Sequence, residues 1–202
     1  MHRTVVVVSN PDPTSLSHHV TAEITAALTA AGVPNEVADL AQEGFDPRFT
    51  LADRQLFHGE APTPPDVAAQ QERLDRADHL VLVFPMYWWS VPALLKGWID
   101  RVFVNGWAFD ERPDGTLLGK LDRKTIHLVP IAAGDADLLR RHGYDTAFST
   151  QIEHGVLDYC GARRGKTTFL YESESKSTET LAAEVREIAS DLVAATSATA
   201  AV

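Results

Sequence analysis

The sequence predicts an α/β fold in which helices cover both faces of a doubly wound, five-stranded parallel sheet. Short apolar runs rich in β-branched residues alternate with segments of helical periodicity along the chain, which is the pattern of repeated β-α-β units. No Gly-x-Gly-x-x-Gly follows the first apolar run. Five strands without that motif favour the strand order 2-1-3-4-5 over the dinucleotide-binding order.

The first strand is predicted at Thr4–Val8, a β-branched run suited to burial on both faces of a sheet. Apolar residues then recur at helical spacing from Val20 to Ala31, and Gly32 stands where a helix C-cap favours glycine. A second strand is predicted over 33–40. Residues 41–65 follow neither period, so we expect a long surface excursion there.

A helix over about 66–77 leads into a third strand at 79–84, "HLVLVF". The next helix is predicted to begin at Pro92 with Ser90 as its cap. Its predicted apolar face is Leu94, Leu95, Trp98, Ile99 and Val102. A turn-rich insert over 105–124 follows and is predicted to be a second surface excursion.

The fourth strand is predicted at 125–133, "TIHLVPIAA", and another helix at about 145–159. The fifth strand is predicted at 167–172, "TTFLYE". A final helix carries a stripe of leucine, valine and isoleucine residues from Leu181 to Leu192. The small residues of 194–202 are expected to fray.

Composition limits the class of protein. A chain of 202 residues favours a single domain, here 1–202. The formal net charge of −10 argues against a nucleic-acid partner, and "ARRGK" (162–166) is interpreted as a solvated connection. The apolar run at the start is too short for an export signal or a membrane span, and Cys160 has no second cysteine to pair with. We therefore expect a cytoplasmic protein that does not insert into a membrane.

In the predicted strand order, ligands bind beyond the carboxyl ends of the strands. The loop after the first strand holds Asn10, Thr14, Ser15 and Ser17 directly before a helix. Hydroxyl groups and free N–H groups at a helix N-terminus suit a phosphate, although the same residues also serve as a simple N-cap. The loop has no lysine of the Walker type, which argues against nucleoside triphosphate hydrolysis.

The loop after the third strand places Tyr87, Trp88 and Trp89 side by side between two prolines. Three consecutive aromatic residues cannot all face one way, so at least one is expected at a surface, a loop or a pocket. A flat, electron-poor ring system could stack there and gain about 1 kcal/mol per ring pair. The alternatives are an aromatic subunit contact or core packing, and core packing is the better interpretation for Trp98 and Phe103.

The stretch "FPMYWWSVPALLKGWIDRVF" (84–103) closely resembles the signature of the flavodoxin-like NAD(P)H:quinone oxidoreductases. "GWAF" (106–109) and "LLGK" (117–120) look like the bacterial general-stress and potassium-efflux-ancillary branch. "HGYDTAFSTQIEHGVLDYCGAR" (142–163) resembles the helix after the third flavin loop, and the similarity runs from about residue 4 to 172. The resemblance implies a flavodoxin-like fold with the strand order given above.

The resemblance also implies a set of flavin-binding residues on three loops. These are Asn10, Thr14, Ser15, Leu16 and Ser17 for the phosphate, Pro85, Met86, Tyr87, Trp88 and Trp89 for the ring, and Ile131, Ala132, Ala133 and Gly134 on the third loop. Relatives often carry Asn at the position of Ser17, and a Thr-Thr-Gly-Gly string on the third loop. The third loop here lacks those hydroxyls, but its backbone N–H groups can still serve.

Two residues are implied as catalytic, His142 and Tyr144. His142 falls on the histidine position of the relatives, and its imidazole could stabilise negative charge at the flavin pyrimidine edge. The tyrosine of the relatives has no match upstream, which leaves Tyr144 as a substitute. His18 and His19 open a helix beside the phosphate loop, where one of them could face the ligand, but we expect both to be solvated. No metal site is predicted.

The implied function is a two-electron, ping-pong transfer from NAD(P)H through FMN or FAD to a quinone or similar planar acceptor. Relatives are homodimers, so Phe109 and residues 41–65 are expected to contribute across an interface. One alternative is a flavin, azo or nitro reductase on the same frame. The other is a non-catalytic protein, either a one-electron carrier or a nucleotide-sensing regulatory subunit.

Overall fold

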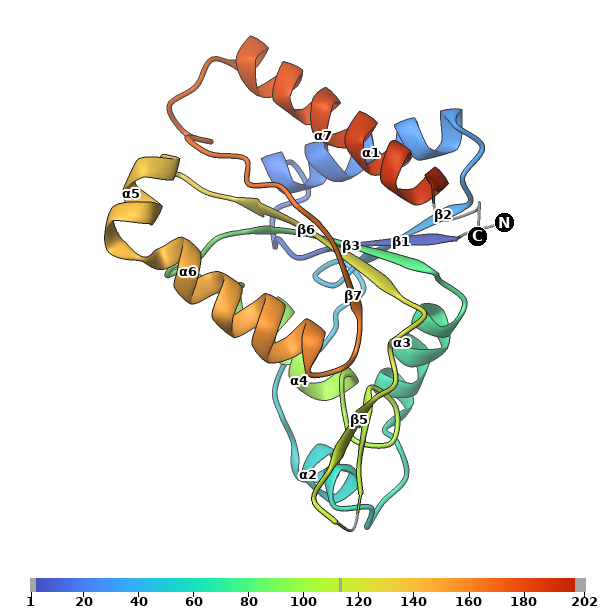
Figure 1. The fold of residues 1–202 in the computed structure, drawn as a ribbon. Coiled ribbons are helices and arrows are strands. Elements are labelled where there is room, and N and C mark those ends of the chain that lie inside the picture. The colour runs from blue at the N-terminus through green and yellow to red at the C-terminus, as the bar shows by residue number, and fades with distance from the viewer. Residues whose placement is uncertain (1–2, 113, 199–202) are drawn as a thin grey trace.

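The computed structural model describes residues 3–112 and 114–198. A five-stranded sheet lies at the centre, and helices cover both of its faces (Figure 1). Its strands are β1 (Thr4–Val8), β2 (Asn35–Asp39), β3 (His79–Pro85), β6 (Thr125–Ile131) and β7 (Arg163–Thr167). They are all parallel in the order β2-β1-β3-β6-β7, which confirms the predicted 2-1-3-4-5 order of a flavodoxin-like sheet.

The two faces of the sheet carry different helices. α1 (Leu16–Ala30) and α7 (Thr178–Ala198) pack together on one face. The other face is covered by α3 (Pro65–Asp75), α4 (Ala93–Val102), α6 (Tyr144–Phe148) and the π-helix η1 (Ser149–Asp158) that continues α6 (Figure 1). Trp98 and Phe103 are buried in this second layer, as predicted from the sequence. The apolar runs of β1 and β3 are buried on both faces.

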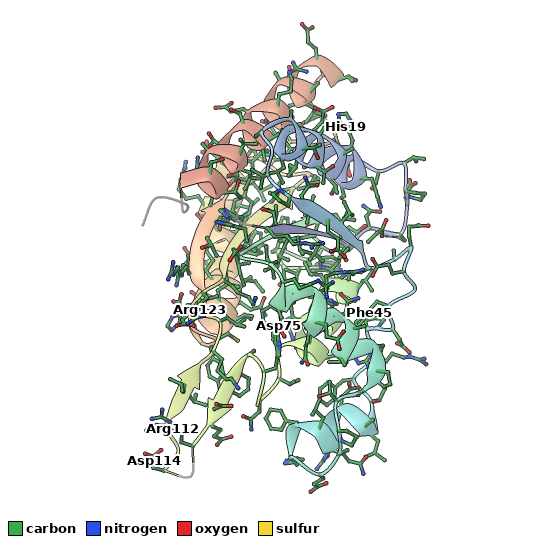
Figure 2. The ribbon with its side chains drawn as sticks, turned by 90° about the vertical axis from the view of Figure 1, so that its right-hand side faces the viewer. His19, Phe45, Asp75, Arg112, Asp114 and Arg123 are labelled. Carbon is green, nitrogen blue, oxygen red and sulfur yellow. The ribbon has the colours of Figure 1, made fainter. Side chains whose placement is uncertain are left out.

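The two predicted excursions contain regular structure. Residues 41–65 include α2 (Leu51–Phe57), and residues 105–124 form the hairpin of β4 (Phe109–Glu111) and β5 (Leu117–Gly119). In Figure 2, Arg112 and Asp114 mark the tip of the hairpin, which projects from the sheet on the same side as α2. The helix and the hairpin in these two segments were missed in the sequence analysis.

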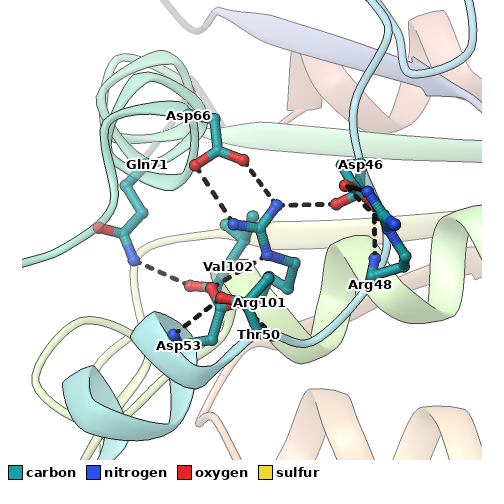
Figure 3. Close-up of polar contacts among 8 residues, drawn as sticks. All are labelled: Asp46, Arg48, Thr50, Asp53, Asp66, Gln71, Arg101 and Val102. Atoms are coloured by element: carbon teal, nitrogen blue, oxygen red, sulfur yellow. Dashed lines mark hydrogen bonds and ion pairs between the residues drawn. The ribbon is translucent and has the colours of Figure 1, made fainter.

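A buried arginine ties the first excursion to the helical layer (Figure 3). The Arg101 guanidinium on α4 donates to Asp53 Oδ1 at 3.0 Å and to Asp66 Oδ2 at 2.6 Å. It also donates to the carbonyl of Asp46 at 2.7 Å and lies over the ring of Phe45. Because Asp53 is fully buried, this pairing compensates a charge that would otherwise be costly to bury.

The predicted fifth strand at 167–172 is wrong in its position. The strand is β7, which contains most of the segment interpreted as a solvated connection, and only an isolated bridge joins Leu170 to Ile131. β7 is an edge strand, so the side chains of Arg163 and Arg164 can remain exposed while the backbone pairs with β6. Gly165 fits this strand because a Cβ there would lie 2.4 Å from His127 Nδ1.

Three further boundaries differ from prediction. A short helix, α5 (Ala136–His142), precedes the predicted helix and is capped by Asp135, whose side chain accepts from the Leu138 N–H. The N-cap of α4 is Pro92, and the predicted cap Ser90 makes a different contact. α7 continues to Ala198, so the predicted frayed tail is helical over 194–198, and 199–202 lie outside the described residues.

Across residues 3–112 and 114–198, no helix is both long and apolar enough to span a bilayer.

Candidate functional site

Three loops meet at the carboxyl ends of β1, β3 and β6, which are neighbours in the sheet. The N–H of Met86 donates to the carbonyl of Ile131 at 2.8 Å, so the second and third loops are joined directly. A pocket of about 160 Å³ lies between them, lined by Met86, Trp88, Trp89, Ala132, Ala133 and Gly134. Six of the nine residues predicted on these two loops line this pocket, whereas Pro85, Tyr87 and Ile131 do not.

A larger groove of about 430 Å³ lies away from these strand ends, beside α2, α4 and η1. Its lining is largely apolar and includes Phe49, Phe57, Phe103, Phe109 and Tyr159. This apolar lining makes the groove a second candidate for a ligand or partner site. The smaller pocket is the candidate site for a planar ligand, because among the described residues no protein acceptor pairs with several of its backbone N–H groups.

The second loop turns tightly through its tryptophans. Tyr87 and Ser90 exchange two backbone hydrogen bonds of 3.1 Å, with Trp88 and Trp89 between them at φ of 48° and 64°. Asn-Gly or Asp-Gly is the usual sequence for such a turn, because other side chains are strained at positive φ. Each tryptophan costs about 1–3 kcal/mol in this conformation, and strain of this kind is concentrated at functional sites.

The three aromatic residues of this turn occupy different environments. Trp88 is 92% exposed and Tyr87 is 52% exposed, while Trp89 is half-buried. The Trp89 ring stacks on Tyr144 with the centroids 4.1 Å apart and the planes 6° apart. His142 also stacks on Tyr144, at 5.3 Å and 18°. Both predicted catalytic residues therefore lie beside the second loop, although His142 itself is exposed.

The turn and the third loop present backbone donors. The N–H of Ala132 donates to the carbonyl of Leu170 at 2.9 Å. Among the described residues, no protein acceptor pairs with the N–H groups of Trp88, Trp89, Ala133 and Gly134. A planar heterocycle with several carbonyl and ring-nitrogen acceptors matches such a set of donors.

The first loop forms the N-terminus of α1. Ser15 is the N-cap and accepts from the N–H of His18, while Asn10 donates to Ser17 Oγ at 3.2 Å. Thr14 differs from the prediction, since both its N–H and its hydroxyl donate to Asp12. These bonds lower the pKa of Asp12. The structure therefore places Asn10, Ser15 and Ser17 together with the first amides of α1, while both Thr14 donor groups are bonded to Asp12.

A polar bridge braces this loop and was missed in the sequence. His18 Nε2 lies 2.8 Å from Asp39 Oδ2 at the end of β2, and its Nδ1 lies 2.9 Å from Ser15 Oγ. The expectation that His18 is solvated is therefore wrong, whereas His19 is exposed (Figure 2). The only signal in the sequence was the position of Asp39 at the predicted strand end.

The residues present fit a flavin. The loops contain no Lys or Arg between 9 and 19 or between 85 and 92, so a phosphate would be held by amides, hydroxyls and the α1 dipole. Ser9 Oγ, at the end of β1, is buried and finds no protein partner within the described part of the chain. In that same part, no cluster of three or more His, Cys, Asp or Glu side chains could hold a metal ion.

Comparison with known proteins identifies the family of the chain and several relatives. A family model described as "Flavodoxin-like fold" matches residues 2–192. Ribosyldihydronicotinamide dehydrogenase (quinone) of Pongo abelii is 30% identical over 178 residues, covering 79% of this chain and 77% of that protein. The uncharacterized NAD(P)H oxidoreductase YcaK of Escherichia coli (strain K12) is 30% identical over 169 residues, covering 83% of each.

A solved structure supports the fold itself. NAD(P)H:quinone oxidoreductase from Methanothermobacter marburgensis superposes with a TM-score of 0.81 at 23% identity, covering 94% of this chain and 95% of that one. At that identity the likeness speaks for the fold alone. Because the family model spans nearly the whole chain, the chain belongs to the family with the flavodoxin-like fold.

Proposed function

We propose that this chain is a flavin-dependent NAD(P)H oxidoreductase that reduces quinones or similar planar acceptors. The observation that carries the proposal is the convergence of two strained tryptophans and four open amides at the carboxyl ends of β3 and β6. The names of the two relatives, a quinone dehydrogenase and an NAD(P)H oxidoreductase, support the same reaction class.

Different loops are proposed to bind the ring and the phosphate of the cofactor. When bound, a flavin accepts a hydride from a dihydronicotinamide and passes both electrons to the acceptor. In our proposal the amides of Trp88, Trp89, Ala133 and Gly134 fix the ring, and Asn10, Ser15, Leu16 and Ser17 hold the phosphate. The exposed faces of Tyr87 and Trp88 favour planar donors and acceptors, which would share one slot and give ping-pong kinetics.

His142 is proposed to stabilise negative charge that develops on the ring. An imidazole can be protonated near neutral pH, and the third loop offers no other cation between 131 and 139. Its exposed position leaves it free to approach a bound ring. Substitution His142→Gln should then lower the rate of flavin reduction while leaving flavin affinity nearly unchanged.

The test removes one proposed flavin-binding N–H group, that of Gly134, by substitution with proline. Gly134→Pro deletes an N–H of the third loop, while Gly134→Ala keeps it and places a Cβ no closer than 3.4 Å to Leu138. The parent and the alanine variant should turn over NAD(P)H and a quinone with parallel lines in double-reciprocal plots. The proline variant should bind flavin at least tenfold more weakly. Equal flavin affinity in both variants would contradict the assigned site.

The same turnover assay shows which acceptor and which donor the protein prefers. A panel of a quinone, an azo dye and a nitroaromatic compound, each with NADH, NADPH and ribosyldihydronicotinamide, ranks them by kcat/KM. Release of the bound flavin by heat, followed by chromatography, identifies it as FMN or FAD. A protein that exchanges single electrons with partners but never turns over a two-electron donor would instead be a carrier.

We further propose that a second copy of the chain covers the apolar groove. Phe49 and Phe57 on its rim are 51% and 41% exposed, and Leu51 of the same excursion is 71% exposed. Apolar surface of this extent on a soluble chain is typical of an interface. Sedimentation should give a dimer for the parent and a monomer for Phe57→Glu. A parent that remains a monomer at micromolar concentration would contradict the dimer.

The bacterial general-stress and potassium-efflux-ancillary branch is our proposal for the subfamily, on the strength of "GWAF" and "LLGK". Both motifs belong to the hairpin region of 105–124, where Phe109 is buried beside Tyr159 of the groove. We also propose a single domain in a cytoplasmic setting, where reduced nicotinamide nucleotides are available. Localisation of a tagged chain by cell fractionation tests that setting.

A further inference from the structure

The turn of Tyr87 to Ser90 does not hold its shape by local preference. Its two central residues are tryptophans at positive φ, where glycine or asparagine is normally found. The two 3.1 Å backbone bonds between Tyr87 and Ser90 close the turn, but they would equally close a turn of lower strain. Contacts from outside the turn must therefore favour this conformation over its alternatives.

Two such contacts reach the turn from one helical segment. Trp89 stacks in parallel on Tyr144, the first residue of α6. Ser90 Oγ donates to Gln151 Oε1 at 2.6 Å, and Gln151 lies on η1, which continues α6 without a break. The turn is thus attached at two successive residues to a single helical arm, which we define as α6 and η1 (144–158).

The arm is itself fixed to the sheet. Phe148 and Ile152, which lie between and beside the two contact residues, are buried at 1% and 0% exposure. Phe148 stacks on Phe84 with centroids 6.2 Å apart, and Phe84 belongs to β3, the strand that enters the turn. The strand, the turn and the arm therefore form one packed unit.

We propose that Tyr144 and Gln151 are positioning residues that hold the tryptophan turn in its strained shape. This inference rests on the proposed function, because the turn is the element assigned to the flavin ring. It assigns Tyr144 a role through the face of its ring, in place of the catalytic role that the resemblance implies. In the described part of the chain, the Tyr144 hydroxyl makes no hydrogen bond.

The decisive comparison is between Tyr144→Phe and Tyr144→Ala. The phenylalanine variant keeps the stacking face and loses only the hydroxyl, whereas the alanine variant loses both. We expect Tyr144→Phe to bind flavin within twofold of the parent and to keep its kcat. Tyr144→Ala should bind flavin at least tenfold more weakly, and Gln151→Ala should show a smaller loss. Thr150→Ala, an exposed neighbour of Gln151, is the matched control and should behave as the parent.

A second readout needs no cofactor. The parallel Trp89 and Tyr144 rings should give a near-ultraviolet circular dichroism band in the flavin-free protein. That band should persist in Tyr144→Phe and disappear in Tyr144→Ala, while the Tm of both variants stays close to that of the parent.

Two results would overturn the inference. One is a Tyr144→Ala protein that binds flavin as tightly as the parent. The other is a Tyr144→Phe protein that loses turnover at unchanged flavin affinity, since the hydroxyl would then act in the chemistry. A parent that binds no flavin at all refutes the proposed function instead. The dichroism of the flavin-free proteins then decides whether Tyr144 holds the tryptophan turn.

Discussion

Single residues carry the clearest departures from local preference in this protein. Trp88 and Trp89 occupy a backbone region that suits glycine, and Asp53 is a fully buried carboxylate. Each departure has an identifiable partner or position: the tryptophans lie at the proposed flavin site, and Asp53 is paired with Arg101. Strain and buried charge of this kind persist only where the surrounding structure holds them.

The first prediction separates strain from function at Trp88. Because this side chain is 92% exposed, its removal loses little packing. Trp88→Gly should therefore raise the free energy of unfolding by about 1 kcal/mol, as the positive φ becomes unstrained. Flavin affinity should fall in the same variant, since the stacking face is lost. Urea denaturation and a fluorescence titration measure the two effects.

Trp88→Ala is the matched control, because it removes the ring and keeps the strain. It should leave the free energy of unfolding near that of the parent. A glycine variant less stable than the alanine variant would show that the turn is not strained in the way described.

The second prediction concerns Arg101. Arg101→Gln leaves Asp53 buried without a cation, so the free energy of unfolding should fall by about 3–5 kcal/mol. Lys96→Gln on the same helix breaks the exposed ion pair with Asp100 and should cost less than about 1 kcal/mol. Urea denaturation of both variants checks the contrast, and equal losses would contradict the burial argument.

At the scale of elements, the sequence predicted the sheet better than its edge. Runs of valine and leucine identify β1 and β3 because both faces of these strands are buried. β7 carries arginine, glycine and lysine and pairs on one side only, so its composition resembles a solvated connection. What holds β7 is its backbone pairing with β6 and the bond from the Lys166 N–H to His127, with Gly165 leaving room for the His127 ring. None of these contacts can be seen in the composition of the strand.

Around the site, too, some elements could be predicted from the sequence and others could not. Loops at strand ends were predictable, because the strand pattern determines where they meet. α2 was not, since Leu51 and Phe57 at its ends are exposed and its buried residue, Asp53, is held by Arg101 from 48 positions away. The Ser90 and Gln151 contact joins residues 61 positions apart and leaves no periodic trace.

The third prediction belongs to the pairing of β6 with β7. His127 Nδ1 accepts from the N–H of Lys166 at 3.0 Å, and its Nε2 lies 3.2 Å from His79 Nδ1. Burial, with smaller effects from His79 and Lys166, lowers the pKa of His127 from 6.5 to about 4. Between these two values the unfolded chain binds a proton that the folded chain does not, so acid favours unfolding.

The contribution of His127 to stability is complete above pH 6.5 and is lost as the pH falls toward 4. The loss should total about 3 kcal/mol, which follows from roughly 1.36 kcal/mol per unit of pKa. His127→Asn keeps an acceptor for the Lys166 N–H without titrating. Chemical denaturation across this pH range should give a steeper decline for the parent than for this variant. Parallel declines would contradict the assignment to His127.

At the scale of the whole molecule, the two proposed surfaces are separate. The proposed flavin pocket lies at the carboxyl ends of the central strands, and the apolar groove lies beside α2, α4 and η1. α4 and η1 connect them, because α4 follows the tryptophan turn and η1 holds Gln151. A second copy bound at the groove would therefore rest on the same helices that support the redox loops.

The central claim is that the strand-end loops hold a flavin that takes hydride from a dihydronicotinamide and delivers two electrons to a planar acceptor. Anaerobic mixing of the purified, flavin-loaded protein with one equivalent of NADPH tests it most directly. We predict that the visible flavin absorbance bleaches in full and returns when one equivalent of a quinone is added. Protein that takes up no flavin, or bound flavin that keeps its colour in excess NADH and NADPH, would contradict the claim.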